Sequence, residues 1–335
     1  MSKPTAVLIS DIHYNLQTLE VADAALRMAV DKANELDVDL VVAGDIHDTK
    51  ANMRAECVNA IMNTVSKLNP SLNAYFLCGN HDLWNEKGKE TSIEFLRNYG
   101  AVVQGMMDPE NLPYMIGYQS NPEAFRLLLN MVPKGSTVVM HQGVQGALAG
   151  DYIVDKSAIP KEWLDGYRVI SGHYHTRQTF KCGKTGVCSY LGNPFTLGFG
   201  EANDPEKGFH VLCDDGSLEF VPANLRKHIV WETHVNETEI ASFRPAIRSI
   251  DLLKVKITGT SEQLANLDKG EVAKKLVIEN DFKLEFNYIE QKTDIDVEST
   301  SSQVELLDNL IDTMHNTTDE QKSRLKELWR KSTTN

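Results

Sequence analysis

The strongest constraint in this sequence is a pattern that occurs five times within residues 7–175. Each time, a short apolar segment with the character of a buried strand is followed at once by a cluster of polar residues. The segments are residues 7–10, 40–43, 75–78, 137–140 and 168–171, and the clusters are residues 11–13, 44–48, 79–82, 141–143 and 172–175. In α/β sheets, ligands bind at the carboxyl ends of the strands. Five clusters at one edge can therefore converge on one site.

Helical patterns lie between several of these strands. Apolar residues recur at helical spacing in residues 16–34, 53–68 and 91–99. Alternating strands and helices predict a layered α/β domain with largely parallel strands. After about residue 183 the helices stop, and residues 187–191, 209–213 and 218–221 have the pattern of strands joined by turns. We expect these three strands to form the second, antiparallel part of a sheet sandwich.

The polar clusters consist mainly of aspartate, histidine and asparagine. Their oxygen and nitrogen donors suit manganese, iron or zinc-like ions better than calcium. Strand-like alternation would place Asp11 and His13 on one face, with Ile12 turned away, and would do the same for His173 and His175. These residue types predict a metal site.

Glycine precedes a candidate ligand in three of the clusters, at Gly44, Gly79 and Gly172. A glycine there lets the chain turn sharply and lets another loop pass close by. A two-metal site for in-line displacement needs a bridging carboxylate, for which Asp45 is the natural choice. An imidazole can then protonate the leaving alkoxide, and His81 is the candidate.

Taken in order, the motifs Asp-x-His, Gly-Asp-x-x-Asp, Gly-Asn-His-Asp, a lone His and Gly-His-x-His resemble those of the calcineurin-like metallophosphoesterase superfamily. The resemblance covers roughly residues 6–200 and implies a four-layer α/β/β/α sandwich that holds two divalent metal ions. Mn2+ is the expected metal, with Mg2+ or Fe2+ as alternatives. The implied roles are Asp11, His13 and His175 for the first ion, Asn80, His141 and His173 for the second, Asp45 as the bridge, and His81 as the general acid.

Residues 190–195 (Tyr-Leu-Gly-Asn-Pro-Phe) and 207–209 (Lys-Gly-Phe) resemble the SbcD branch of this superfamily, especially its phage-type members. That branch often has His where this chain has Asp48. We place Asp48 with His81 among the catalytic residues, and we expect Asp48 and Asp82 to orient ligand imidazoles. Beside them, His47 is expected to be outer-shell or solvent-facing.

The SbcD resemblance also implies a domain order and partners. It predicts a nuclease domain at residues 1–222, a small α+β capping and DNA-binding domain at 223–298, and a helical tail at 299–335. The implied activity is Mn-dependent exonuclease and endonuclease cleavage during DNA end processing. The implied partners are DNA and an SbcC-type coiled-coil ATPase, with a homodimer of this chain inside a heterotetramer.

The tail carries two capping-box patterns, at residues 302–305 and 318–321. The first opens an apolar stripe and the second precedes Leu325, Leu328 and Trp329, so we expect two short amphipathic helices. Such helices usually pack on their own domain. Because residues 292–303 have the composition of a linker, we favour docking on the ATPase partner.

The composition further limits the classes of function that are open to this chain. The net charge of −13 argues against nucleic-acid binding through the general field of the protein, so local patches, metal or a partner must supply the attraction to DNA. Five cysteines fit reduced thiols, and a zinc site at Cys182 and Cys188 lacks two further evident ligands. With no long apolar segment and no signal-peptide pattern, we expect a cytoplasmic protein that does not enter membranes.

Two other functions stay open. The acidity favours a phosphatase or cyclic-nucleotide phosphodiesterase acting on small molecules, and a DNA-end-binding scaffold with weak nuclease activity is a third possibility. Tyr174 and Phe195 are candidates for stacking on a base, with core packing as the alternative.

Overall fold

The structure is a computed structural model of residues 1–335. It describes residues 2–50, 52–84, 90–150, 152–153, 158–202, 204, 206–236, 248, 250–269, 283–288, 310–314 and 317–332. The chain divides into two compact units. One comprises Met1–Trp231, Arg244–Val255 and Asp281–Lys283, and the other comprises Glu232–Phe243, Lys256–Asn280 and Leu284–Asn335.

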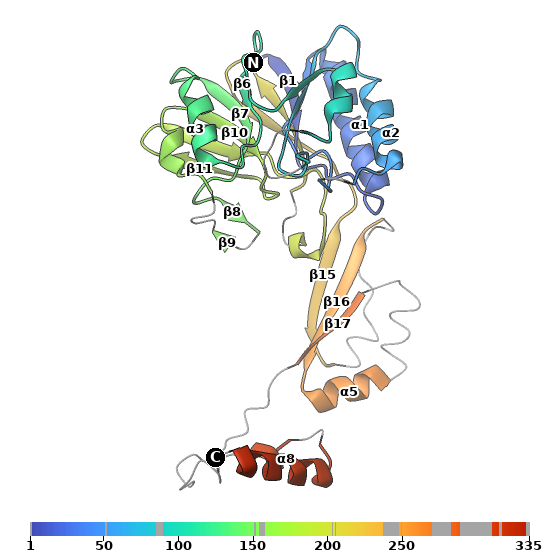
Figure 1. The fold of residues 1–335 in the computed structure, drawn as a ribbon. Coiled ribbons are helices and arrows are strands. Elements are labelled where there is room, and N and C mark those ends of the chain that lie inside the picture. Colours follow the sequence, from blue (N-terminus) through green and yellow to red (C-terminus); the bar gives the residue numbers. More distant parts are fainter. Residues whose placement is uncertain are drawn as a thin grey trace. The chain divides into compact units, whose positions relative to one another are not determined.

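The first unit is built on two six-stranded sheets (Figure 1). The first sheet has the order β14-β13-β1-β2-β3-β4. Its strands are β1 (Pro4–Ile9), β2 (Asp39–Val42), β3 (Ala74–Leu77), β4 (Ala101–Val103), β13 (Gly208–Cys213) and β14 (Leu218–Pro222). Strands β1 to β4 are parallel, and β13 joins β1 in the antiparallel sense, with Val7 opposite Val211.

The second sheet has the order β11-β12-β10-β7-β6-β5. Its strands are β5 (Met106–Met107), β6 (Tyr114–Ile116), β7 (Thr137–His141), β10 (Arg168–Gly172), β11 (Gln178–Cys182) and β12 (Gly186–Tyr190). The strands β6, β7, β10 and β12 run parallel, and the hairpin partner β11 and the edge strand β5 are antiparallel. A separate short hairpin pairs β8 (Leu148–Ala149) with β9 (Tyr152–Ile153).

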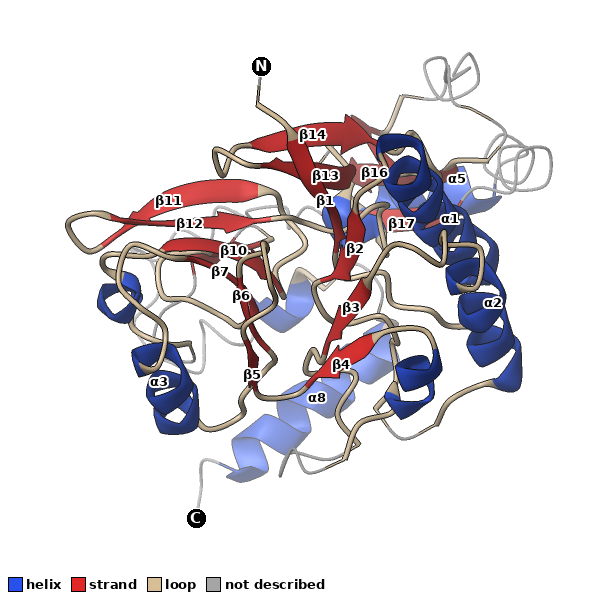
Figure 2. Ribbon diagram, turned by 90° about the horizontal axis from the view of Figure 1, so that it is seen from above, coloured by secondary structure: helices blue, strands red, loops and turns tan. Residues whose placement is uncertain are grey.

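The strands β1, β2, β3, β7 and β10 are buried on both faces over most of their length, which explains their continuous apolar sequences. On β1, Val7 and Ile9 face helices α1 (Leu19–Leu36) and α2 (Ala55–Val65), whereas Ala6 and Leu8 face the other sheet. On β7, Val138 and Met140 pack instead toward helix α3 (Pro122–Asn130). Seen from above, α1 and α2 lie on the outer side of the first sheet and α3 lies on the outer side of the second (Figure 2). The predicted four-layer α/β/β/α architecture is confirmed.

Two features of this unit differ from the sequence-based expectation. Residues 187–191, 209–213 and 218–221 do not form one antiparallel sheet. The first of them belongs to β12, which runs parallel to β10 in the second sheet, while β13 and β14 extend the first sheet. Residues 91–99 contain a 3-10 helix, η1 (Glu94–Asn98), instead of an α-helix. Strand patterns identify strands but do not determine which sheet each one joins.

Beyond the two sheets, β15 (His228–His234), β16 (Leu252–Gly259) and β17 (Lys283–Tyr288) form a three-stranded sheet in that order. Helix α5 (Ser261–Lys269) follows β16, so strands and a helix occur where the α+β capping domain is predicted. The predicted boundaries at residues 222/223 and 298/299 stay a prediction. No helix among the described residues is long and apolar enough to span a membrane.

The second predicted tail helix is present as α8 (Asp319–Ser332). Its capping box forms as expected, because Thr318 Oγ1 accepts the backbone N–H of Gln321 and Gln321 Oε1 accepts the backbone N–H of Thr318. Leu325 is exposed. Most of the first predicted tail helix, including its capping box at residues 302–305, lies outside the described residues.

Candidate dinuclear metal centre

The loops that follow β1, β2, β3, β7 and β10 bring their polar residues together. Three groups have donor atoms that all lie within 4.8 Å of one another. They are Asp11, His13 and His175; Asp45, His141 and His173; and His13, Asp48 and His81. The first group is the set predicted for the first ion, and the second group combines His141 and His173, predicted for the other ion, with the predicted bridge Asp45. The structure thus brings these side chains together, and their roles as ligands remain a prediction.

The loop backbone is unusual at four of these positions. Asp11, His13, Asp45 and His173 have φ angles of 53°, 51°, 52° and 95°. Residues other than glycine rarely adopt this left-handed backbone conformation, because it is strained. Backbone strain of this kind is concentrated at functional sites. Asp11 and His13 therefore reach the site through left-handed turns and not through an extended strand, while Ile12 turns away into the core as expected.

The three predicted close approaches at glycine are confirmed. A Cβ atom on Gly44 would lie 2.2 Å from Nδ1 of His141, and one on Gly79 would lie 2.1 Å from Oδ1 of Asp45. A Cβ atom on Gly172 would lie 1.9 Å from Oγ of Ser10. These positions accommodate no side chain because neighbouring loops of the site occupy the space.

Asp45 lies at the middle of the cluster and is 2% exposed. Its Oδ2 is 3.3 Å from Nε2 of His141 and 3.8 Å from Nε2 of His13, and its Oδ1 accepts the backbone N–H of His81 at 2.8 Å. Burial opposes ionisation of Asp45, but His141, His13 and His81 outweigh it and hold the pKa of this carboxyl well below its usual value. Asp45 is placed as a bridging carboxylate would be.

The contacts of His141 and Asn80 indicate that the site favours a positive charge. Nδ1 of His141 donates to the carbonyl of Ala43 at 2.8 Å, so Nε2 faces Asp45 and lies 3.3 Å from Oδ1 of Asn80. That Asn80 oxygen is also 2.7 Å from Nδ1 of His173. Burial alone would lower the pKa of His141, but the charge of Asp45 raises it to about 9. A positive charge is therefore favoured beside Asp45, and a bound cation would supply it.

On the other side of Asp45, two imidazoles face each other through their Nε2 atoms, those of His13 and His175, 3.2 Å apart. Nδ1 of His175 lies 2.7 Å from Oε1 of Glu201, and a proton held there leaves the Nε2 lone pair pointing at His13. Nδ1 of His13 lies 3.5 Å from Oδ1 of Asp48, which suits an ion pair better than a hydrogen bond. Two lone pairs at such a separation repel unless a proton or a cation lies between them, so these donors fit a divalent metal.

His81 is placed beside these ligands and is not among the two predicted ligand sets. Its Nδ1 lies 2.6 Å from the backbone carbonyl of Asp48 and donates to it, which leaves Nε2 unengaged by that contact. The carboxylate of Asp48 accepts from Nδ2 of Asn15 at 3.1 Å, and the proximity of His13 lowers its pKa. Asp48 thus holds His81 by its backbone and His13 by its side chain.

Asp82 differs from expectation, and one of the two alternatives for His47 is excluded. Asp82 does not orient an imidazole. It accepts the backbone N–H groups of Asp45, His47 and Gly79 at 2.8, 3.1 and 2.8 Å, which ties two ligand loops together. Burial, with the charge of Asp45, raises its pKa to about 7. His47 is 1% exposed and packs on Phe95, so it is not solvent-facing, and burial lowers its pKa to about 4.

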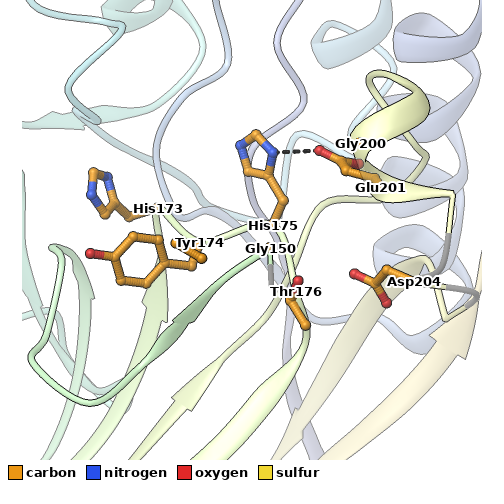
Figure 3. A pocket seen from close by; sticks show the side chains of 9 residues that line it. Gly150, His173, Tyr174, His175, Thr176, Gly200, Glu201 and Asp204 are labelled. Atoms are coloured by element: carbon orange, nitrogen blue, oxygen red, sulfur yellow. Dashed lines mark hydrogen bonds and ion pairs between the residues drawn. The ribbon is translucent and has the colours of Figure 1, made fainter. Parts of the chain in front are cut away.

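Glu201 is a residue of the site that the sequence reasoning missed. It lies on the short helix η3 (Phe199–Glu201), with its carboxylate directed at His175, and both residues line a cavity of about 350 Å3 with His173, Tyr174 and Thr176 (Figure 3). Burial opposes its ionisation, but contact with His175 holds the pKa of Glu201 at about 2. Glu201 lies between the two segments that resemble the SbcD branch, residues 190–195 and 207–209, and belongs to neither.

Of the two aromatic candidates for base stacking, Phe195 is 1% exposed and belongs to the core between the first sheet and its helices, so that idea is wrong for it. Tyr174 lines the cavity beside His173. Cys182 and Cys188 are buried in the core of the second sheet, and no metal-ligand group among the described residues includes them.

Comparison with known proteins agrees with this geometry. The calcineurin-like phosphoesterase family matches residues 4–177, just over half of the chain. Protein 244L of Invertebrate iridescent virus 6, whose name describes it as a phosphoesterase, is 23% identical over 234 residues, which are 62% of this chain and 79% of that protein. The DNA double-strand break repair protein Mre11 of Methanocaldococcus jannaschii is 22% identical over 336 residues, covering 90% of this chain and 88% of that one.

Among solved structures, a dimetal phosphatase from Danio rerio superposes with a TM-score of 0.37 at 13% identity, covering 64% of this chain and 93% of that one. The family match spans the loops after β1, β2, β3, β7 and β10, from which the clustered aspartate and histidine residues come. The chain belongs to the calcineurin-like phosphoesterase family.

Proposed function

We propose that this phosphoesterase is a Mn-dependent DNA nuclease that cleaves phosphodiester bonds at DNA ends and internally. The observation that carries the proposal is the extent of the similarity to the archaeal protein named as a double-strand break repair protein, which covers 90% of this chain. Such an alignment must continue past residue 177, where the family match ends, into the region of the three-stranded sheet.

The residues of the centre have distinct roles in this reaction. Two divalent ions, when bound by the two ligand sets and Asp45, would offset charge on the phosphate and lower the pKa of the attacking water. His81 would donate a proton from Nε2 to the leaving alkoxide oxygen, with its ring fixed through Nδ1 by the carbonyl of Asp48. Asp48 and Asp82 keep the loops that carry His13, His81 and Asp45 in place.

A local basic surface beside the centre supports a polyanionic substrate. Lys254 and Lys283, from strands β16 and β17, place their ammonium nitrogens 4.9 and 5.4 Å from the centre of the Phe199 ring. Phe199 belongs to the same short helix as Glu201, which lines the cavity with His175. Positive charge thus lies next to the site in a chain whose net charge is −13.

The test is cleavage of linear duplex DNA by the purified chain with Mn2+, measured against hydrolysis of bis-p-nitrophenyl phosphate under the same conditions. We expect DNA cleavage that is lost on chelation and restored by Mn2+. The acidity of the chain favours the alternative of a small-molecule phosphodiesterase, which would hydrolyse the small ester and leave DNA intact even with both ions bound.

We also propose that α8 docks on a coiled-coil ATPase of the SbcC type, with two copies of this chain in the assembly. The support is the exposed Leu325 on a capped helix and the composition of residues 292–303. Removing residues 300–335 should leave Mn-dependent cleavage by the chain alone unchanged and abolish co-purification of the ATPase. A scaffold function predicts instead that His81→Ala leaves the biological function in the cell intact, whereas removing residues 300–335 abolishes it.

A further inference from the structure

A buried lysine lies directly behind the proposed metal ligand His175. The side chain of Lys207 is 4% exposed. It donates to the backbone carbonyl of His175 at 3.0 Å, to Oδ1 of Asn193 at 2.5 Å and to Oδ2 of Asp204 at 2.8 Å. It also lies 3.4 Å from Oε2 of Glu201.

A buried charge is costly unless its partners satisfy it, and this one has a complete set. The ammonium group has three N–H donors, and three oxygen acceptors lie within hydrogen-bonding distance. Two carboxylates, on Asp204 and Glu201, balance its charge. The cluster therefore fixes the loop between β12 and β13 against the loop that follows β10.

Glu201 completes the connection from Lys207 to the imidazole of His175. Its Oε2 accepts from Nδ2 of Asn193 at 3.0 Å and from the backbone N–H of Leu197 at 3.1 Å. Its Oε1, held in this way, lies 2.7 Å from Nδ1 of His175 (Figure 3). These contacts fix the orientation of the carboxylate.

This arrangement determines which nitrogen of His175 is available. A carboxylate at Nδ1 favours the tautomer with the proton on that atom, and Nε2 is then left with a lone pair that points at Nε2 of His13, 3.2 Å away. Outer residues of this kind set the orientation and basicity of a ligand imidazole. Both the side chain and the backbone of His175 are held by one network.

We propose that Glu201 is a positioning residue for metal binding, which fixes the tautomer and ring orientation of His175, and that Lys207 and Asn193 hold Glu201 in place. This inference rests on the metal centre of the proposed function and not on DNA as the substrate. It also gives a role to the Asn-Pro-Phe and Lys-Gly-Phe segments, which contribute Asn193 and Lys207.

In the experiment, the full chain is freed of metal and titrated with Mn2+ alone. Binding is measured by calorimetry and by the EPR signal of unbound Mn2+. The wild type should bind two ions. Glu201→Ala should weaken one of the two affinities by about 10- to 100-fold and leave the other unchanged. Glu201→Gln, which can still accept from Nδ1 of His175, should recover part of that affinity.

Glu206→Gln is the matched control, because Glu206 lies on the same loop and pairs with Arg177 at the surface. It should bind both ions as the wild type does. A purely structural role for Glu201 would lower the melting temperature of Glu201→Ala without changing either affinity of the folded protein, and that result would overturn the inference. Equal affinities for Glu201→Gln and Glu201→Ala would also overturn it.

The outcomes separate this inference from the proposed function. Unchanged Mn2+ affinities in Glu201→Ala, with DNA cleavage intact in the wild type, would refute only the role of Glu201. Two bound ions without DNA cleavage would refute the nuclease and leave the role of Glu201 standing. If Glu201→Ala does not fold, the comparison of Glu201→Gln with Glu206→Gln decides the question by the same affinities.

Discussion

Nδ1 of His81 donates to the backbone carbonyl of Asp48 at 2.6 Å, so one motif loop holds the imidazole of the next by a main-chain atom. A backbone acceptor cannot be ionised or removed by a change of side chain. The rings of His81 and His13 meet edge to face, with centroids 4.8 Å apart. The first prediction follows from this placement of His81 beside the ligands.

Replacing His81 with alanine should lower kcat for DNA cleavage by about 10²- to 10⁴-fold, because the leaving oxygen loses its proton donor. Mn2+ binding should stay at two ions, since His81 is outside the predicted ligand sets. Rates under saturating Mn2+, together with calorimetric titration, check both parts. An ester with a p-nitrophenolate leaving group needs less protonation, so its kcat should fall less in the variant. An equal fall in kcat on both substrates would contradict the general-acid role.

Gly172 gives a second prediction. Adding one methyl group there would place a carbon 1.9 Å from Oγ of Ser10 and 2.8 Å from Nδ1 of His141, so neighbouring ligand loops must move. Gly172→Ala should lower the free energy of unfolding by about 1–3 kcal/mol and weaken Mn2+ binding. Denaturant titration measures the first effect and calorimetry the second. Gly105→Ala, where no atom lies within 4 Å of the added carbon, is the control and should change neither.

The third prediction concerns pH and uses His210, a histidine on β13 outside the metal centre. It is 4% exposed and its Nδ1 has no hydrogen-bond partner among the described residues. Burial, with some contribution from Arg177, lowers its pKa from 6.5 to about 4. As the pH falls below 6.5, the unfolded chain takes up this proton before the folded chain does, so stability is lost down to about pH 4.

His210→Gln removes this titration. The stability of the wild type should decrease relative to the variant between pH 6.5 and 4, by about 3 kcal/mol in total. Urea unfolding at pH 7.5 and at pH 4.5 measures the free energy of unfolding of both proteins. The difference between wild type and variant cancels the titration of all other groups. A wild-type and a variant curve that run parallel over this range would show that His210 is not buried in the neutral form.

The fourth prediction addresses the basic surface. Lys254→Glu combined with Lys283→Glu should weaken DNA binding and reduce the slope of log K against log salt by about 2, one for each lost phosphate contact. Hydrolysis of bis-p-nitrophenyl phosphate should not change, because the small ester does not reach these lysines. Lys32→Glu, on helix α1, reverses a charge away from the site as a control. Equal DNA affinities for control and double variant would remove the support that this surface gives to the nuclease.

The sequence was sufficient to predict the layers and the convergence of nine polar side chains, because short apolar strands and the polar clusters after them are local signals. It was not sufficient to assign β12 and β13 to their sheets, since pairing partners are set by contacts between distant residues. Asp11 and His13 show the same limit, because their left-handed backbone follows from hydrogen bonds to Gly44 and Asp45 on another loop.

Glu201 could not be assigned for a related reason. It lies 26 positions after His175, and nothing in a list of residues distinguishes it from Glu206 on the same loop. Only the burial of Lys207 and the direction of the η3 helix separate the carboxylate that touches the site from one that pairs at the surface. The buried Asp82 is similar, since its partners are backbone N–H groups that leave no trace in sequence.

The 3.2 Å approach of His13 to His175 joins positions 162 residues apart, and β1 completes its pairing only with β13, near position 210. Contacts that distant in the chain form late, because a long loop must close first. During synthesis on the ribosome, the site formed by Asp11, His13 and His175 can therefore be completed only after the chain has been made as far as β13, which ends at Cys213. Uptake of the metal at that pocket would then indicate that β13 has joined the sheet, and a translation product that ends before β13 would have no hydrolytic activity.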